Sequence, residues 1–93
     1  MINLVFYLSP KAGEKYPTRA DYKKINSLIT ELNTMLIRFA RSNDIDYIDL
    51  NKIIADENNV LKDEYTTDGV HLTDSAYREW TKMINKILLK NKI

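Results

Sequence analysis

One stretch of the sequence holds a carboxylate and an imidazole at a spacing that suits proton transfer. It reads YTTDGVHLTDSAYREW over residues 65–80 and contains the only histidine, His71, with Asp68 three residues before it. A general-base histidine needs one ring nitrogen facing a nucleophile and the other donating to an orienting acceptor. Gly69 permits the tight turn that Asp68 needs to reach the ring. The alternative is a turn-capping aspartate beside an ordinary surface histidine.

The residues after His71 favour a helix that would hold this loop in place. Leu72 can anchor the loop in the core, and Thr73 is a fitting N-cap. Asp74 suits the positive end of a helix dipole, and Lys90 suits the opposite end. Apolar residues recur at helical spacing: Ala76, Tyr77, Trp80, Met83, Ile84, Ile87 and Leu88. We expect a helix from about residue 74 to residue 90.

The N-terminal half of the sequence indicates a strand, a helix and a second strand. Residues 2–8, INLVFYL, form an apolar run typical of a strand buried on both faces, and residues 11–18 favour a loop. Residues 45–50, IDYIDL, suit a second short strand. Between them an apolar stripe predicts a long helix through Tyr22, Ile25, Leu28, Ile29, Leu32, Met35, Leu36, Phe39 and Ala40. This order predicts a βαβ unit with parallel strands.

The ends of the long helix and the segment after the second strand are less regular. Thr18 with Asp21 resembles a capping box, and Ser42 with Asn43 is a plausible stop. Residues 51–59 suit a turn or two of helix, and residues 60–71 favour a loop. The aromatic residues of both stripes are expected in the core; they are Tyr22, Phe39, Tyr77 and Trp80.

Composition limits the classes of protein that need to be considered. The 93 residues carry a formal charge of +1, which gives no reason to expect a nucleic-acid partner. There is no cysteine, so disulfides and thiolate metal sites are excluded, and one histidine makes no recognisable metal site. No apolar run approaches the ~20 residues that span a bilayer. The start MINLVFYLSPK does not resemble a signal peptide.

The predicted elements do not complete a normal sheet. Two parallel strands are fewer than the usual ~5–6, and the first strand is as apolar as a central strand. Left at an edge, such a strand would pair with another chain. We therefore expect residues 1–93 to form a single, incomplete α/β domain.

The block DGVHLTDSAYREW resembles the C-terminal signature of the SGNH hydrolases, also called the GDSL esterase/lipase family. The residues in register are Asp68, His71, Leu72, Ala76, Tyr77 and Trp80. LVFYLSP resembles the family's fourth strand, and INSLITELNTMLIRFARSNDIDYIDL resembles the following helix and fifth strand, so almost the whole chain is covered. The resemblance implies a three-layer α/β/α sandwich of flavodoxin-like type and a Ser-His-Asp triad, with Asp68 as the acid and His71 as the base.

Other parts of the family pattern are absent. The family's nucleophile lies in an N-terminal Gly-Asp-Ser block, and a glycine and an asparagine from later blocks complete the oxyanion hole. This chain has no Gly-Asp-Ser and no Gly-x-Asn-Asp, and Gly13 and Gly69 stand in other contexts. We therefore expect these residues to be the C-terminal half of such a domain.

The four serines are weak candidates for a replacement nucleophile. Ser9 ends the first strand, at the edge where sites form in open α/β sheets, but Pro10 after it indicates a structural turn. Ser75 lies in the first turn of the last helix, and Ser27 and Ser42 lie on or beside the long helix. None has a supporting motif.

The expected function is that of a piece of a serine esterase, inactive alone, whose domain cleaves carboxylic esters such as acetyl or lipid acyl esters. The alternative is a small non-catalytic α/β interaction module. Expected partners are the N-terminal half of the same enzyme, or a second copy through the first strand, and a small ester; no cofactor is implied. The expected compartment is the cytoplasm if Met1 is the true start, and it is undetermined if a preceding half carried a signal peptide.

Overall fold

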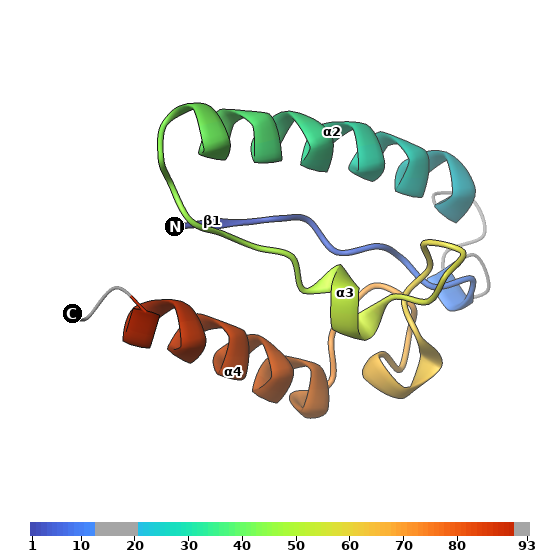
Figure 1. Cartoon of the computed structure of the whole chain (residues 1–93). Helices are drawn as coiled ribbons and strands as arrows, with labels where there is room; N and C mark the ends of the chain where they lie inside the picture. The colour runs from blue at the N-terminus through green and yellow to red at the C-terminus, as the bar shows by residue number, and fades with distance from the viewer. Residues whose placement is uncertain (13–20, 91–93) are drawn as a thin grey trace.

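The protein is an α/β sandwich whose middle layer is a small parallel sheet. A computed structural model describes residues 1–12 and 21–90. Helix α2 (Tyr22–Ser42) covers one face of the sheet, and helix α4 (Asp74–Lys90) covers the other (Figure 1). The two strands between them are β1 (Ile2–Asn3) and β2 (Tyr47–Ile48). This arrangement confirms the predicted partial three-layer architecture.

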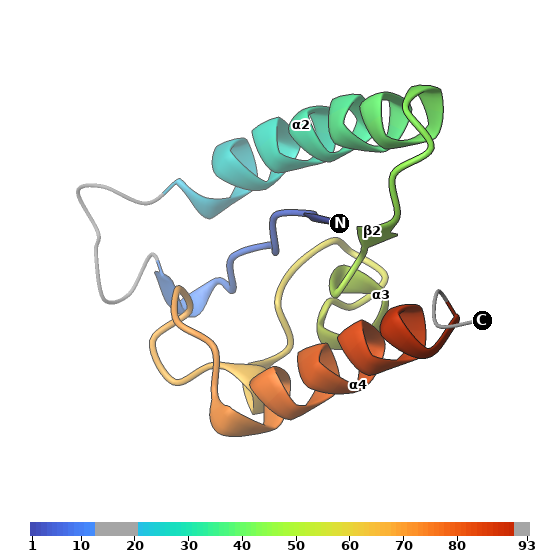
Figure 2. The same ribbon diagram turned by 90° about the vertical axis from the view of Figure 1, so that its left-hand side faces the viewer.

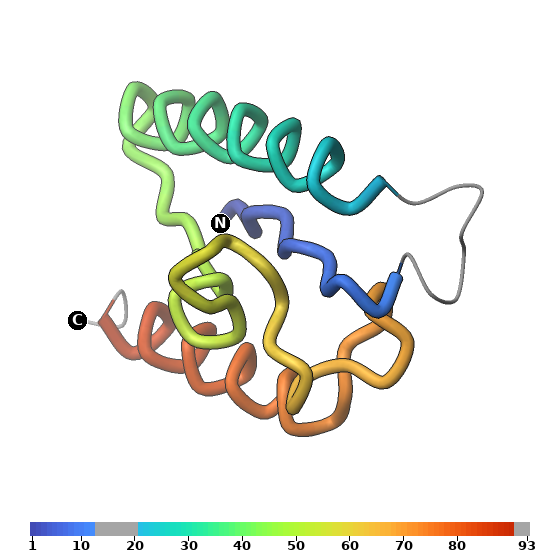
Figure 3. Tube along the Cα trace, turned by 90° about the vertical axis from the view of Figure 1, so that its right-hand side faces the viewer, coloured from blue at the N-terminus to red at the C-terminus, as the bar shows by residue number. Residues whose placement is uncertain are grey.

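The two strands pair in parallel, as a strand, helix and strand in succession require. Ile2 lies opposite Tyr47 and Asn3 opposite Ile48. The backbone N–H of Leu4 donates to the carbonyl of Ile48 at 2.9 Å, which extends the pairing by one residue. Parallel strands need a long crossover connection, and α2 supplies it on one face of the sheet (Figures 2 and 3).

Both strands are shorter than the predicted ranges 2–8 and 45–50, and the reason for the first is tertiary. From Val5 onward, the backbone bonds mainly to asparagine side chains rather than to a strand. Asn33 accepts from the N–H of Val5 and donates to its carbonyl, both at 2.8 Å. Asn26 does the same for Leu8, at 2.8 and 3.0 Å. These amides are buried on one face of α2, where they occupy backbone groups that a neighbouring strand would use.

A third asparagine bonds to the same backbone segment from outside α2. Asn51 is the first residue of the short helix α3 (Asn51–Ile54). Its side chain accepts from the N–H of Tyr7 at 3.0 Å and donates to the carbonyl of Val5 at 2.9 Å. We call Asn26, Asn33 and Asn51 the asparagine clamp. It holds residues 5–8 against α2 and α3, and no strand in the described part of the chain pairs with them.

The helix ends agree only in part with the predicted caps. Thr18 lies outside the described residues, and the cap of α2 is Asp21 itself, which accepts from the N–H of Lys24 at 3.2 Å. The proposed role of Asp21 inside a capping box is therefore wrong. The predicted end at Ser42 and Asn43 is confirmed.

The start of α4 agrees with the predicted N-cap. The Thr73 hydroxyl accepts from the N–H of Ala76 at 3.4 Å. Before this helix, the segment predicted as loop contains a 3-10 turn, η1 (Asp63–Tyr65), and an antiparallel bridge between Thr66 and Leu72. The bridge brings the two ends of the histidine loop together.

A buried hydrophobic cluster packs residues in and beside α3 against α4. It consists of Leu50, Ile54, Leu61 and Ala76, with Leu72 and Trp80 among the half-buried residues packed against it. The anchoring role predicted for Leu72 is thus confirmed. The prediction that all stripe aromatics are core residues is wrong for Phe39 and Tyr77, whose side chains are exposed.

Candidate active site

The structure brings the two predicted site residues into direct contact. The ring nitrogen Nδ1 of His71 lies 2.6 Å from Oδ2 of Asp68. The other carboxylate oxygen, Oδ1, accepts from the backbone N–H groups of Val70 at 2.9 Å and His71 at 2.8 Å. One carboxylate therefore orients both the imidazole ring and the turn that carries it.

These hydrogen bonds also set the charge of the carboxylate. The backbone N–H of His71, then that of Val70 and then the His71 ring hold the pKa of Asp68 well below its ordinary value. Each of these bonds favours the ionised form because it donates to an anion. Asp68 is therefore ionised at neutral pH and acts only as an acceptor, so the proton between the pair belongs to Nδ1 of His71.

The rest of the imidazole ring faces outward. The side chain of His71 is 75% exposed, whereas that of Asp68 is 16% exposed. Within residues 1–12 and 21–90 no side chain is hydrogen-bonded to Nε2 of His71. The pair thus has a fixed inner side and an open outer side, which is the arrangement that a base needs when its nucleophile comes from elsewhere.

Thr66 closes the loop that carries the pair. Its hydroxyl donates to the carbonyl of His71 at 2.7 Å and accepts from the N–H of Gly69 at 2.9 Å. The residue is almost fully buried. Sequence reasoning missed Thr66, although a threonine two residues before Asp68 is the kind of residue that bonds to nearby backbone in turns.

Gly69 docks this loop onto the N-terminal segment. Its carbonyl accepts from the N–H of Ser9 at 3.0 Å. Its φ of +88° lies in the region that favours glycine, and an added Cβ would come within 2.2 Å of the backbone nitrogen of Ala12. The predicted need for glycine is confirmed, and the close approach to Ala12 adds a second reason for it.

The serines do not complete the site from within the described chain. Ser9 is fully buried, and its hydroxyl donates to Asp63 at 3.3 Å and accepts from the N–H of Lys11 at 3.2 Å. These bonds agree with a turn residue. The Ser75 hydroxyl lies 2.9 Å from that of Thr73, and Ser27 and Ser42 lie on α2. No described serine is hydrogen-bonded to His71.

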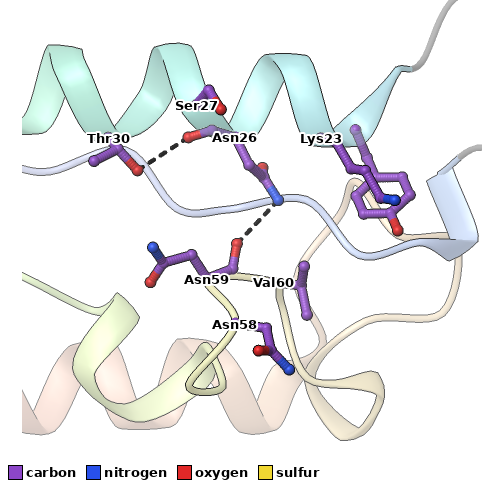
Figure 4. A pocket seen from close by; sticks show the side chains of 8 residues that line it. Lys23, Asn26, Ser27, Thr30, Asn58, Asn59 and Val60 are labelled. Atoms are coloured by element: carbon purple, nitrogen blue, oxygen red, sulfur yellow. Dashed lines mark hydrogen bonds between the residues drawn. The ribbon is translucent and has the colours of Figure 1, made fainter.

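A polar pocket of about 350 Å³ lies away from this pair (Figure 4). It lies between the first turns of α2 and residues 58–60, where the Asn26 amide donates to the carbonyl of Asn59 at 3.0 Å. Neither Asp68 nor His71 lines it. The described parts of the chain also contain no group of three or more potential ligand side chains placed to hold a metal ion. None of their helices is long and apolar enough to cross a bilayer.

Two solved structures resemble this chain. A GDSL-like lipase from Bacteroides thetaiotaomicron matches 95% of it with a TM-score of 0.74 and 27% sequence identity. A protein described as an acylhydrolase from Bacteroides fragilis matches 95% of it with a TM-score of 0.70 and 25% identity. No family model and no curated protein matches the sequence.

These matches relate the chain to the SGNH/GDSL hydrolases. It covers 41% of the first solved chain and 40% of the second, so it spans about two fifths of the length of these proteins. The chain is therefore an α/β piece related to an SGNH/GDSL-type hydrolase fold, and the resemblance expected from residues 68–80 is confirmed at the level of the fold.

Proposed function

We propose that the chain is the C-terminal part of an SGNH/GDSL-type serine ester hydrolase, in which His71 is the general base and Asp68 orients it. The observation that carries this proposal is the 2.6 Å contact between Nδ1 of His71 and Oδ2 of Asp68, with the rest of the ring exposed. The substrate is a carboxylic ester, such as an acetyl or longer acyl ester.

The geometry supports a defined division of labour. Asp68 keeps the proton on Nδ1, which leaves Nε2 as the acceptor for a serine hydroxyl proton. After the serine attacks the ester carbonyl, the protonated ring donates to the leaving alcohol. The Asp68 carboxylate stabilises the imidazolium that exists between these two transfers. The serine and the oxyanion donors come from the part of the domain outside these residues.

The chain alone should therefore be inactive. Removing the nucleophile from a triad costs nearly all of the rate, and here the oxyanion donors are missing as well. Hydrolysis of p-nitrophenyl acetate by the isolated chain should equal that of the His71→Ala variant. A rate well above background that disappears in His71→Ala would show that the chain carries its own nucleophile.

The proposal itself is tested in a completed domain. In a chimera, the present chain replaces the matched part of the Bacteroides thetaiotaomicron lipase, which then supplies the remainder of the fold. The chimera should hydrolyse the ester, and His71→Ala should abolish the activity. The matched control is Arg78→Ala, which changes an exposed residue on α4. A folded chimera whose rate does not depend on His71 would refute the assigned role.

A further inference from the structure

The apolar stripe of α2 is only partly covered. Leu32 and Met35 are 43% and 63% exposed. With Leu28 and Phe39, which are also exposed, they recur every three or four residues and form one flank of the helix. This flank is apolar over about three turns, which is unusual for a helix surface that faces only water.

The position of the opposite flank shows which way the apolar flank points. That opposite flank is polar, and its members are Lys23, Ser27, Thr30, Thr34, Arg38 and Arg41. Thr30 and Thr34 line a hollow together with Asp49 and Lys52, which follow β2. The polar flank therefore lies on the β2 side of α2. The apolar flank lies on the other side, where no strand of residues 1–12 and 21–90 pairs with β1.

Helix α4 has a matching flank on the same side. Tyr77 and Leu88 are exposed, with Ile84 half-buried between them. Tyr77 lines an apolar cavity of about 320 Å³ whose wall includes Leu4 and Val5 from the N-terminal segment. Both helices thus turn apolar side chains toward the free side of β1, which lies between them in Figure 2. We call Leu28, Leu32, Met35, Phe39, Val5, Tyr77 and Leu88 the open face.

We propose that the open face docks the remaining part of an SGNH/GDSL-type hydrolase domain, as a unit of strand and helices that packs beside β1 and against both flanks. The identity of this occupant rests on the proposed function. More than half of each solved neighbour lies outside the part that this chain matches, within one polypeptide. The open face is where a piece of that fold lacks its neighbouring strand and helices.

A second copy of the chain fits this face less well. Two copies related by a two-fold axis would pair their β1 segments antiparallel, as a continuous sheet. The asparagine clamp already occupies both backbone groups of Val5 and the N–H of Tyr7. Pairing through this edge is restricted to its first residues, so the occupant has to be held by burial of side chains on both flanks.

The test compares one substitution in two contexts. Leu32→Glu is made in the isolated chain and in the chimera with the Bacteroides thetaiotaomicron lipase, and thermal unfolding is measured in both. It should lower the Tm of the chimera by more than about 4 °C, because the carboxylate is buried there, and shift the isolated chain by only about 1–2 °C. Thr34→Glu, on the polar flank of the same helix, should have little effect in either. On α4, Tyr77→Glu with Arg78→Glu as its control should give the same pattern.

Three outcomes would overturn the inference. One is an equal effect of Leu32→Glu in the two contexts. Another is a chimera that does not unfold as one cooperative unit. The third is an isolated chain that sediments as a dimer and dissociates with Leu32→Glu, because the occupant is then a second copy. Ester hydrolysis is read separately: a chimera with the expected Tm pattern but no His71-dependent rate refutes the proposed function and leaves the docking surface standing.

Discussion

Asp68 holds His71 at two points, through the ring and through the backbone. Its Oδ2 lies 2.6 Å from the ring nitrogen Nδ1, and its Oδ1 accepts the backbone N–H of the same histidine at 2.8 Å. The imidazole is therefore fixed relative to its own main chain by a single carboxylate. Removal of the Asp68 side chain should therefore disturb the tautomer and the turn together.

Asp68→Asn should lower kcat of the completed domain by about 10³–10⁴-fold. The amide can keep the backbone bond through its oxygen, but it no longer holds the proton on Nδ1 as an anion does. Steady-state hydrolysis of a short-chain ester by the chimera measures the effect. Glu64→Gln, on the adjacent η1 turn, is the matched control and should keep the parent rate. An unchanged rate in Asp68→Asn would favour the alternative of a non-catalytic interaction module.

Acid should weaken the fold through Asp68. Its pKa in the folded chain lies below the unfolded value of about 4, so its contribution to stability is fully present above that value and is lost as pH falls through the folded-state pKa. We expect the difference in unfolding free energy between the wild type and Asp68→Asn, measured by urea unfolding, to shrink as the pH falls below about 4. A difference that grows below that pH would contradict this sign.

Thr66→Val should destabilise the chain more than Thr66→Ser. Valine keeps the shape but leaves the buried N–H of Gly69 and the carbonyl of His71 without their partner, at a cost of about 1–3 kcal/mol. Serine keeps the hydroxyl and loses one buried methyl group, about 0.8 kcal/mol. Urea unfolding of the three proteins gives the order. If valine is as stable as serine, the hydroxyl does not hold the loop.

Gly69→Ala should cost about 2 kcal/mol or more. The new Cβ meets the backbone of Ala12 at 2.2 Å, and the φ of +88° disfavours any L side chain. Thr67→Ala, two residues earlier and exposed, controls for the loop position and should stay within about 0.5 kcal/mol of the wild type. Thermal unfolding followed by circular dichroism is sufficient to separate the two.

Asn33→Ala should cost about 2–4 kcal/mol, because it removes both bonds to the backbone of Val5 at a buried position. Asn43→Ala is the matched control. Its amide bonds only to the carbonyl of Phe39 at the exposed end of α2, so the change should be about 0.5 kcal/mol or less. Similar costs for the two variants would mean that the clamp adds nothing beyond an ordinary surface hydrogen bond.

Features that depend on near neighbours in sequence were predictable. The helices α2 and α4 follow from apolar spacing, and the Thr73 cap lies three residues before its donor. The contact of Asp68 with His71 spans the same short distance, with Gly69 making the turn. Torsion angles and hydrogen bonds within three or four residues are set locally, so residue types at fixed spacing are enough to indicate them.

The features that only the tertiary structure decided depend on contacts between residues far apart in the chain. The side chains of Asn26, Asn33 and Asn51 form hydrogen bonds to the backbone of residues 5–8, across separations of 18 to 46 residues. Because these bonds replace pairing with a strand, β1 ends after Asn3. An asparagine within an apolar stripe does not indicate which distant backbone groups its side chain will bond to. The apolar stripes of α2 and α4 likewise show which side chains favour burial. They do not show how much of each stripe the rest of this chain covers. Leu32 and Tyr77 remain exposed because burial depends on what packs against a helix, and periodicity within the helix carries no information about that.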